Sequence, residues 1–243
     1  MKILRIFLIS IFFLSCSSDD NNSINQIENE SINKILPLGA SRVDGLRPFY
    51  ESYRYELWKK LVDNNWEFDF IGTQKDNASY PTINSITFDN DHEGRGGWTS
   101  GQIANNINSW IDEVGTADIV LFSSPGGNDA LQNLPFDEAI VNIKKIINSL
   151  QENNPNITIL IEKPAPGKTS IMTTTLTNYL DALSNELNTI ITEYSTTTSN
   201  IVIVDMNTGF TDDLLADDVH YNEEGAKFIA NRYYTILKDI LAN

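Results

Sequence analysis

A serine stands on a glycine-flanked turn near the start of the chain, in the segment Gly39-Ala40-Ser41-Arg42-Val43-Asp44-Gly45. On a tight turn the hydroxyl of Ser41 is exposed, and neighbouring backbone N–H groups are free to face an oxyanion. Such a serine can act as a nucleophile. Serine is also common as an ordinary turn or helix-capping residue, so this segment alone does not establish a reaction.

A second segment, Ser124-Pro125-Gly126-Gly127-Asn128-Asp129, combines glycines with an amide side chain. Two glycines let the backbone approach a ligand closely, and the Asn128 amide can donate a hydrogen bond to a developing negative charge. The same composition also favours an ordinary turn. The segment indicates an anion-stabilising loop only when a nucleophile lies beside it.

The third segment, Asp217-Asp218-Val219-His220, has the spacing of a base and its orienting acid. A neutral imidazole takes a serine proton only when its other nitrogen is held by an acceptor, and a carboxylate three residues earlier can be that acceptor. The alternative is a structural histidine near a helix start. The chain has two histidines, His92 and His220, so a histidine-based mechanism must use one of them.

Short apolar runs alternate with longer segments of helical period, which predicts an α/β domain with a parallel sheet. The strand candidates are residues 35–38, 68–71, 118–122, 157–161 and 201–205. The helix candidates are about 50–64, 100–111, 136–151, 173–194 and 223–241. Between them, the long polar segment 72–97 is expected to be a functional loop, because structureless loops of that length are uncommon in compact domains.

Five strands separated by helices predict a three-layer, flavodoxin-like sandwich with a five-stranded parallel sheet. Ligands of such sheets bind at the carboxyl ends of the strands. Ser41, Asn128 and His220 each follow a strand candidate, the first, third and fifth along the chain. We therefore expect the three side chains to converge on one edge of the sheet.

This arrangement resembles the SGNH hydrolase (GDSL-type esterase) superfamily from about residue 35 to the C-terminus. Its four sequence blocks correspond, in order, to Ser41, Gly97, the Gly126–Asp129 segment and Asp217 with His220. The resemblance implies the SGNH hydrolase fold and ester hydrolysis by a serine. No Gly-x-Ser-x-Gly elbow occurs, which argues against an ordinary α/β-hydrolase.

A narrower resemblance lies in the segment "DHEGRGGWTSGQI", from Asp91 to Ile103. This block, "ILPLGAS" and "YRYELWKKLVDNNWEFDFIGTQ" are similar to carbohydrate esterase family three, whose members are acetylxylan esterases. The likeness implies that Ser41 is the nucleophile, His220 the general base and Asp217 its orienting partner. It further implies an oxyanion hole made of the Ser41 and Gly97 N–H groups and the Asn128 amide. The implied substrate is an acetylated poly- or oligosaccharide.

The long loop and the nucleophile block hold the remaining candidates. Trp98 could stack on a sugar, while Arg95 and His92 could contact sugar hydroxyls; for Arg95 a loop-bracing ion pair is the alternative. No spaced set of oxygen ligands is evident, so we predict neither a metal site nor a cofactor. The family block reads Gly-Asp-Ser, whereas this chain has Ala40 in place of the acid. We expect activity to survive this change, with Asp44 or Asp129 compensating.

The N-terminal residues read as a targeting signal and a linker. Residues 1–15 have a basic start and a short apolar core, which is typical of a secretory signal. The lone Cys16 then resembles the diacylated cysteine of a bacterial lipoprotein. Residues 16–33 are predicted to be a flexible acidic tether, similar to the surface-export signal of Bacteroidetes lipoproteins, and 34–243 the hydrolase domain. The sequence thus predicts an extracytoplasmic, outer-membrane lipoprotein exposed on the cell surface, with no other membrane contact.

The net charge of the chain limits the classes of binding partner that we expect. The formal net charge is −16, and it becomes −18 when Lys2 and Arg5 are removed with the signal. Such a surface repels phosphate backbones, so no nucleic-acid partner is expected, and neutral glycans suit it better than anionic ones.

Two alternatives remain from the sequence alone. A lysophospholipase or thioesterase would use the same triad but would need a long apolar acyl groove, whereas the 72–97 loop is polar. A glycan-binding surface lipoprotein would keep the fold and lack catalysis.

Overall fold

Residues 33–241 are described by the structure, which is a computed structural model of the chain. The strands are β1 (Lys34–Gly39), β2 (Asp69–Phe70), β3 (Gln74–Lys75), β4 (Asp91–Gly94), β5 (Ile119–Phe122), β6 (Thr158–Lys163) and β7 (Asn200–Asp205). The helices are α1 (Ser41–Asp44), α2 (Arg54–Asp63), α3 (Ser100–Val114), α4 (Gly127–Leu131), α5 (Phe136–Asn153), α6 (Thr174–Tyr194) and α7 (Glu223–Leu237), with a 3₁₀ turn at Asp212–Leu214. The predicted signal, Cys16 and nearly all of the tether lie outside the described residues.

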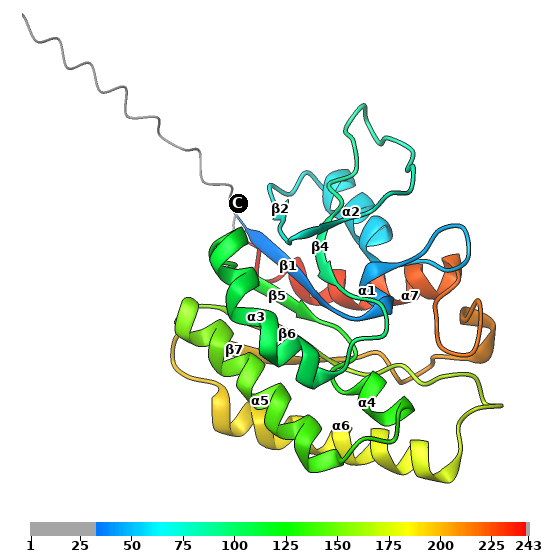
Figure 1. Cartoon of the computed structure of the whole chain (residues 1–243). Helices are drawn as coiled ribbons and strands as arrows, with labels where there is room; N and C mark the ends of the chain where they lie inside the picture. The colour runs from blue at the N-terminus through cyan, green and yellow to red at the C-terminus, as the bar shows by residue number, and fades with distance from the viewer. Residues whose placement is uncertain (1–32, 242–243) are drawn as a thin grey trace, which may run out of the picture. The chain divides into compact units, whose positions relative to one another are not determined.

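The strands form one mostly parallel sheet in the order β3-β4-β1-β5-β6-β7, with β2 also paired to β1 (Figure 1). β2 pairs with the first residues of β1, and β4 pairs with the last, so both occupy the same edge of β1 in succession. Only β3 is antiparallel, to β4. The predicted α/β class with helices flanking a parallel sheet is confirmed.

Side chains that alternate between the two faces of the sheet divide the hydrophobic core into two layers. Ile35, Ile119 and Leu121 contribute to one apolar cluster with helices α2 and α7. Their neighbours Leu36 and Val120 contribute to the other cluster, with α3, α5 and α6. Successive side chains of a strand point to opposite faces, and both faces here are covered by helices, which explains why the strand sequences are almost wholly apolar.

Among the differences from the sequence-based prediction, three change a strand count or move a helix end by several residues. The 72–97 segment contains β3 and β4 and is not a continuous loop, so the sheet has seven strands where five were expected. Helix α2 begins at Arg54, not Tyr50, because the N–H of Glu51 donates to the Tyr221 carbonyl in a β-bridge (2.8 Å). Helix α7 ends at Leu237, where the hydrogen bonds tighten to the three-residue spacing of a frayed last turn.

The described residues contain no helix that is both long enough and apolar enough to cross a bilayer.

Candidate active site

Ser41, His220 and Asp217 form one chain of hydrogen bonds at the carboxyl edge of the sheet. Ser41 opens α1 directly after β1, and His220 lies two residues before the Asn222 cap of α7. The Ser41 Oγ lies 2.8 Å from Nε2 of His220, and Nδ1 of His220 lies 2.7 Å from Oδ2 of Asp217. The three residues therefore meet as the sequence predicts, although Ser41 and His220 are 179 positions apart.

Asp217 is held as a carboxylate. Partial burial raises its pKa, but the N–H groups of Val219 and His220 and the His220 ring donate to it and bring the pKa down to about 2. An ionised carboxylate only accepts hydrogen bonds, so Nδ1 of His220 carries the proton. In the neutral ring Nε2 is then an acceptor, directed at the Ser41 hydroxyl. This geometry can draw a proton from serine as the oxygen attacks a carbonyl.

Tyr50 stacks on His220, a contact that the sequence analysis missed. The two rings lie 3.8 Å apart between centroids and are within 11° of parallel. Packing against the Tyr50 ring restricts rotation of the imidazole, which supports the orientation fixed by Asp217. Nothing in the sequence singled out Tyr50, because its place beside His220 depends on the non-local bridge between Glu51 and Tyr221.

Arg42, the residue after Ser41, joins three segments of the site. Its guanidinium donates to the carbonyls of Val219 (2.9 Å), Ala165 (2.8 Å) and Pro166 (3.1 Å) and to Ser124 Oγ (3.3 Å). Since Val219 precedes His220, Arg42 fixes the histidine loop relative to the nucleophile turn. Arg42 stands within the nucleophile motif, but nothing in the sequence indicates this role.

Glu162 anchors the Ser124 turn from inside the protein. Its carboxylate is fully buried and accepts hydrogen bonds from the Ser124 N–H (2.7 Å), from Ser123 Oγ (2.9 Å) and from the Tyr233 hydroxyl (2.8 Å). Burial raises the pKa of Glu162. Ser124 has a left-handed φ of 44°, which a non-glycine residue adopts only when its surroundings hold it there. The sequence clue was an acid directly after the apolar run "ILI" at residues 159–161.

Ser41 and Asn128 line the same pocket, and Gly97 precedes Trp98, whose carbonyl accepts the Asn128 amide. Nδ2 of Asn128 donates to the Trp98 carbonyl (2.7 Å), which leaves its second amide hydrogen available. The N–H groups of Ser41 and Gly97 donate to none of the described residues. Gly97 has a left-handed φ of 79°, and nothing lies within 4 Å of the place where a Cβ would project. Backbone and amide N–H donors that no protein acceptor uses are available to bind a developing oxyanion.

The two acids expected to compensate for Ala40 both hold the loop that bears Gly97. Asp44 Oδ2 accepts the Gly96 N–H (3.1 Å). Asp129 is buried and accepts both the N–H (2.8 Å) and the hydroxyl (2.7 Å) of Ser100, at the start of α3. The backbone of β4 also packs directly on α1, because a Cβ at Gly94 would lie 2.4 Å from the Asp44 nitrogen.

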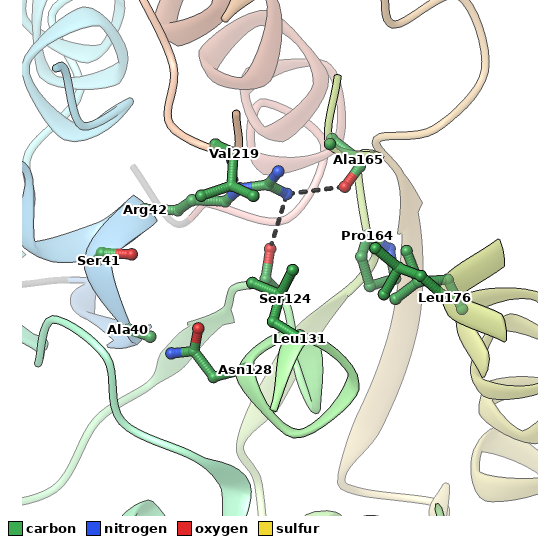
Figure 2. Close-up of a pocket in the computed structure, with 13 residues that line it drawn as sticks. Ala40, Ser41, Arg42, Ser124, Asn128, Leu131, Pro164, Ala165, Leu176 and Val219 are labelled. Carbon is green, nitrogen blue, oxygen red and sulfur yellow. Dashed lines mark hydrogen bonds between the residues drawn. The ribbon is translucent and has the colours of Figure 1, made fainter. Parts of the chain in front are cut away.

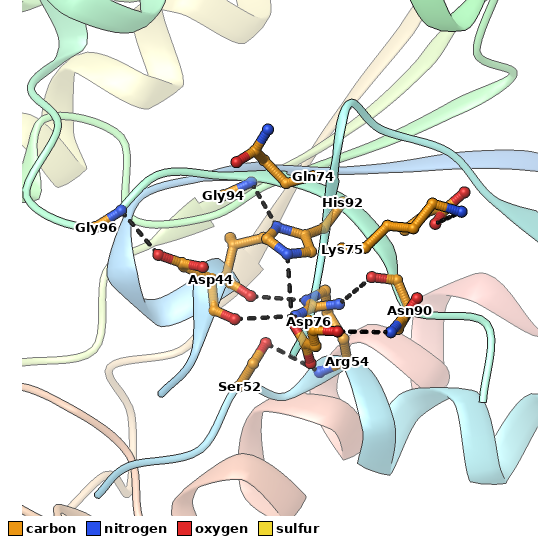
Figure 3. Close-up of polar contacts among 12 residues, drawn as sticks. Asp44, Ser52, Arg54, Gln74, Lys75, Asp76, Asn90, His92, Gly94 and Gly96 are labelled. Carbon is orange, nitrogen blue, oxygen red and sulfur yellow. Dashed lines mark hydrogen bonds and ion pairs between the residues drawn. The ribbon is translucent and has the colours of Figure 1, made fainter. Parts of the chain in front are cut away.

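His92 is buried and does not reach the site, which corrects its prediction as a sugar contact. Its side chain is only 1% exposed; Nδ1 accepts the Gly94 N–H (3.0 Å), and Nε2 lies 3.3 Å from Asp76 (Figure 3). Burial lowers the pKa of His92. Burial also raises the pKa of Asp76, but its hydrogen bonds from His92 and Arg54 bring that pKa down to about 2. The ring supports the backbone of β4.

Arg54 connects the same network to the nucleophile helix. Its fully buried guanidinium donates to the carbonyls of Val43 (2.7 Å), Asp44 (3.0 Å) and Asn90 (3.0 Å) and pairs with Asp76 (2.5 Å) (Figure 3). The Arg54 side chain therefore binds carbonyls of α1 and the carbonyl of the residue that precedes β4.

Replacing Arg54 should destabilise the fold strongly. Arg54→Met leaves the buried Asp76 carboxylate and three carbonyls without their donor, so we expect a loss of about 3–5 kcal/mol in the free energy of unfolding. Urea titration followed by circular dichroism measures it. Lys60→Met, on the same helix and without an ion pair to any described residue, is the matched control and should change stability by less than about 0.5 kcal/mol. Equal stability of the two variants would contradict this role.

Arg95 and Trp98 make internal contacts. Arg95 pairs with Glu93 (2.7 Å), donates to Thr73 Oγ1 (2.8 Å) and lies over the Trp110 ring (4.5 Å to the centroid). Trp98 packs against Trp110 with ring centroids 5.5 Å apart. The structure thus shows the loop-bracing alternative for Arg95, and neither residue lines the pocket beside Ser41, although Trp98 lines a smaller adjoining pocket with Ala40 and Asn128. A sugar contact by the exposed parts of these two residues stays a prediction.

A pocket opens beside the nucleophile (Figure 2). Ser41, Ala40 and Asn128 lie along one side, and Pro164 and Leu176 lie opposite. Its volume is about 50 Å³.

Comparisons with known proteins agree with this geometry. A family model described as the GDSL-like lipase/acylhydrolase family matches residues 72–228. Among solved structures, a carbohydrate esterase family 3 protein from Talaromyces cellulolyticus has a TM-score of 0.73 at 28% identity, covering 86% of this chain and 100% of that one. A family 3 carbohydrate esterase from Clostridium thermocellum has a TM-score of 0.69 at 29% identity, covering 86% and 96%. An acetyl esterase mutant with an acetate ion has a TM-score of 0.72 at 27% identity, covering 86% and 100%.

No curated protein matches the chain. The family model nevertheless covers more than half of the 243 residues, and the structural neighbours share both its fold and its type of activity. This chain belongs to the GDSL-like lipase/acylhydrolase family and is a carboxylic-ester hydrolase.

Proposed function

We propose that the chain removes O-acetyl groups from carbohydrate with a Ser41–His220–Asp217 triad. The observation that carries the proposal is the continuous chain of hydrogen bonds from Ser41 Oγ through the imidazole to Asp217. A serine aligned with a neutral imidazole, beside unpaired N–H donors, is arranged for acyl transfer.

The reaction has two steps. Ser41 Oγ attacks the ester carbonyl carbon as its proton passes to His220 Nε2, and the N–H groups of Ser41 and Gly97 with the Asn128 amide stabilise the oxyanion. The tetrahedral intermediate collapses, the sugar oxygen takes the proton from His220, and an acyl-serine remains. Water then attacks this ester while His220 accepts its proton, and the acid leaves as Ser41 Oγ is reprotonated.

Three observations favour an acetylated carbohydrate. Two of the similar structures are family 3 carbohydrate esterases, and another is an acetyl esterase. The net charge of −16 suits a neutral polymer better than an anionic lipid head group. The segment between α2 and α3 is polar rather than apolar on its exposed side.

Acetate release tests the proposal directly. Acetylated xylo-oligosaccharides incubated with the wild type should yield acetate, while Ser41→Ala should yield none above the uncatalysed background. Faster hydrolysis of a lysophospholipid or an acyl thioester than of the acetylated sugar would contradict the carbohydrate substrate. Sugar binding that is indifferent to Ser41→Ala, with no hydrolysis, would indicate a glycan-binding protein instead.

Removing the Asn128 amide should slow the chemical step. A single oxyanion donor is worth about 3 kcal/mol, so Asn128→Ala should lower kcat on an acetyl ester by roughly two to three orders of magnitude. Gln132→Ala is the control, because that amide also contacts the Gly97 segment (3.4 Å to the Gly97 carbonyl) and has no proposed part in the reaction. Near-normal turnover in Asn128→Ala, with an unchanged melting temperature, would remove Asn128 from the oxyanion hole.

We also propose that the mature protein begins at a lipidated Cys16 and is held outside the cytoplasm, at the outer membrane. The support is the order of basic residues, apolar core and lone cysteine in residues 1–16. Cells that express the chain should incorporate labelled palmitate into it, and Cys16→Ser should abolish the label. Absence of label from the wild type would contradict the anchor.

A further inference from the structure

Away from the reacting atoms, the side chains that line the pocket beside Ser41 are apolar apart from Arg42 and Ser124. Ser41 and Asn128 stand on one side, and Pro164, from the chain that follows β6, and Leu176, from α6, lie across from them (Figure 2). The apolar lining consists of Leu131 of α4, Leu176 and Leu180 of α6, and Pro164 and Ala165. Its leucines belong to two helices that are otherwise distant in sequence, so the pocket is a feature of the tertiary fold.

The polar groups of the pocket have few hydrogen bonds to offer a sugar. The guanidinium of Arg42 is already bonded to three carbonyls and to Ser124, and Ser124 contacts the buried Glu162. A sugar ring placed here would bury hydroxyl groups without partners, which is unfavourable. An alkyl chain would bury only apolar surface. Of the two substituents on an ester carbonyl held by the oxyanion donors, the acyl chain is the one that fits.

Leu131 supports the same assignment. Its side chain is 45% exposed although it lines the pocket next to the nucleophile. An acyl chain lying against α4 would remove this apolar surface from water, which favours binding.

The volume of this pocket is larger than the volume that an acetyl group occupies. An acetyl group places one methyl beyond the carbonyl, whereas about 50 Å³ holds roughly three to five water-sized groups at about 10–15 Å³ each. We propose that this pocket is the acyl subsite and that it accepts acyl groups of about three to six carbons, with Leu131, Leu176 and Leu180 setting the limit. The inference rests on the proposed serine esterase function and extends its acyl specificity beyond acetyl.

The test is a series of nitrophenyl esters from acetyl through propionyl, butyryl and hexanoyl to octanoyl. Each methylene buried in an apolar site contributes up to about fourfold, so kcat/KM for the butyryl ester should exceed that for the acetyl ester by about tenfold. The rate should fall again at octanoyl, when the chain outgrows the pocket. If the acetyl ester is hydrolysed and kcat/KM for the butyryl ester is tenfold lower than for the acetyl ester, the proposed acyl subsite is wrong. The proposed esterase function would not be affected by that result. No hydrolysis of any ester would instead overturn the function.

Pocket variants give a second, independent readout. Leu176→Trp fills the wall and should lower the butyryl-to-acetyl ratio of kcat/KM by at least about tenfold, since a pocket discriminates one or two methylenes on that scale. Because both rates come from one preparation, the ratio is insensitive to partial misfolding. Leu131→Ala, at a half-exposed position, should shift the optimum toward longer chains.

The matched control is Leu134→Trp, which changes an exposed leucine that does not line the pocket. It should leave the ratio as in the wild type. An unchanged ratio in both Leu176→Trp and Leu131→Ala, or a wild-type rate that keeps rising to octanoyl, would contradict the subsite as described.

Discussion

Ser41→Ala is expected to reduce kcat on an acetyl ester by about 10⁵–10⁶-fold without unfolding the protein, the scale found when a nucleophilic serine is removed. The Oγ is the atom that forms the acyl-enzyme, and no other described hydroxyl lies against His220 Nε2. Its loss leaves Nε2 of His220 without its serine partner and opens no cavity in the core, because Ser41 lies at the pocket surface. Steady-state kinetics with thermal melting measure both effects.

Ser109→Ala is the matched control for this change. Ser109 is an exposed serine of α3 whose hydroxyl donates only to the Asn106 carbonyl of its own helix. The Ser109→Ala variant should retain the kcat of the wild type. Turnover in Ser41→Ala within tenfold of the wild type would mean that hydrolysis does not pass through this serine.

Asp217→Asn should lower kcat by about 10⁴-fold at neutral pH, as expected when the acid of a serine triad becomes an amide. Oδ1 can still accept the N–H groups of Val219 and His220, so the loop geometry should persist. The new amide can, however, donate to Nδ1 of His220 and place the ring proton on Nε2. In that tautomer His220 cannot accept the proton of Ser41.

Asp218→Asn, the same change one residue later, is the control because Asp218 has no side-chain contact with His220. The pH dependence adds a further check. The folded pKa of Asp217 is about 2, below the ordinary value of 3.8, so its contribution to stability is present above pH 3.8 and is lost as pH falls toward 2. The wild-type rate between pH 4 and 8 therefore should not follow ionisation of Asp217. Equal kcat in the two asparagine variants would exclude Asp217 as the orienting acid.

Sequence reasoning predicted the α/β fold because the buried strands are nearly continuous apolar runs. Both faces of β5 and of β6 are covered by helices, so consecutive residues of each strand are apolar. Such a run can be recognised from the strand's own sequence, without knowledge of its neighbours. β3 and β4 were missed because they hold two and four residues, most of them polar, and their pairing depends on contacts with β1 and on the Arg54 network. Such strands have no periodicity to detect.

The candidate triad was predictable because each member lies in a short segment with its own chemical signature. Asp217 and His220 are three residues apart, so their pairing is a local property of the sequence. The supporting residues could not be found in this way. Tyr50 is placed beside His220 by a β-bridge between residues far apart in the sequence. Arg42 hydrogen-bonds three segments that the fold brings together. His92 shows the converse error, because it was expected to contact sugar hydroxyls and its side chain is buried.

The central claim is that Ser41 is a nucleophile activated by His220, and covalent labelling tests it most directly. A serine-directed fluorophosphonate should modify the wild type once, and peptide mass spectrometry should place the adduct on Ser41. Ser41→Ala should remain unlabelled, and His220→Ala should react at least about a hundredfold more slowly because the hydroxyl then lacks its base. Labelling at another residue, or an equal rate in His220→Ala and the wild type, would contradict the claim.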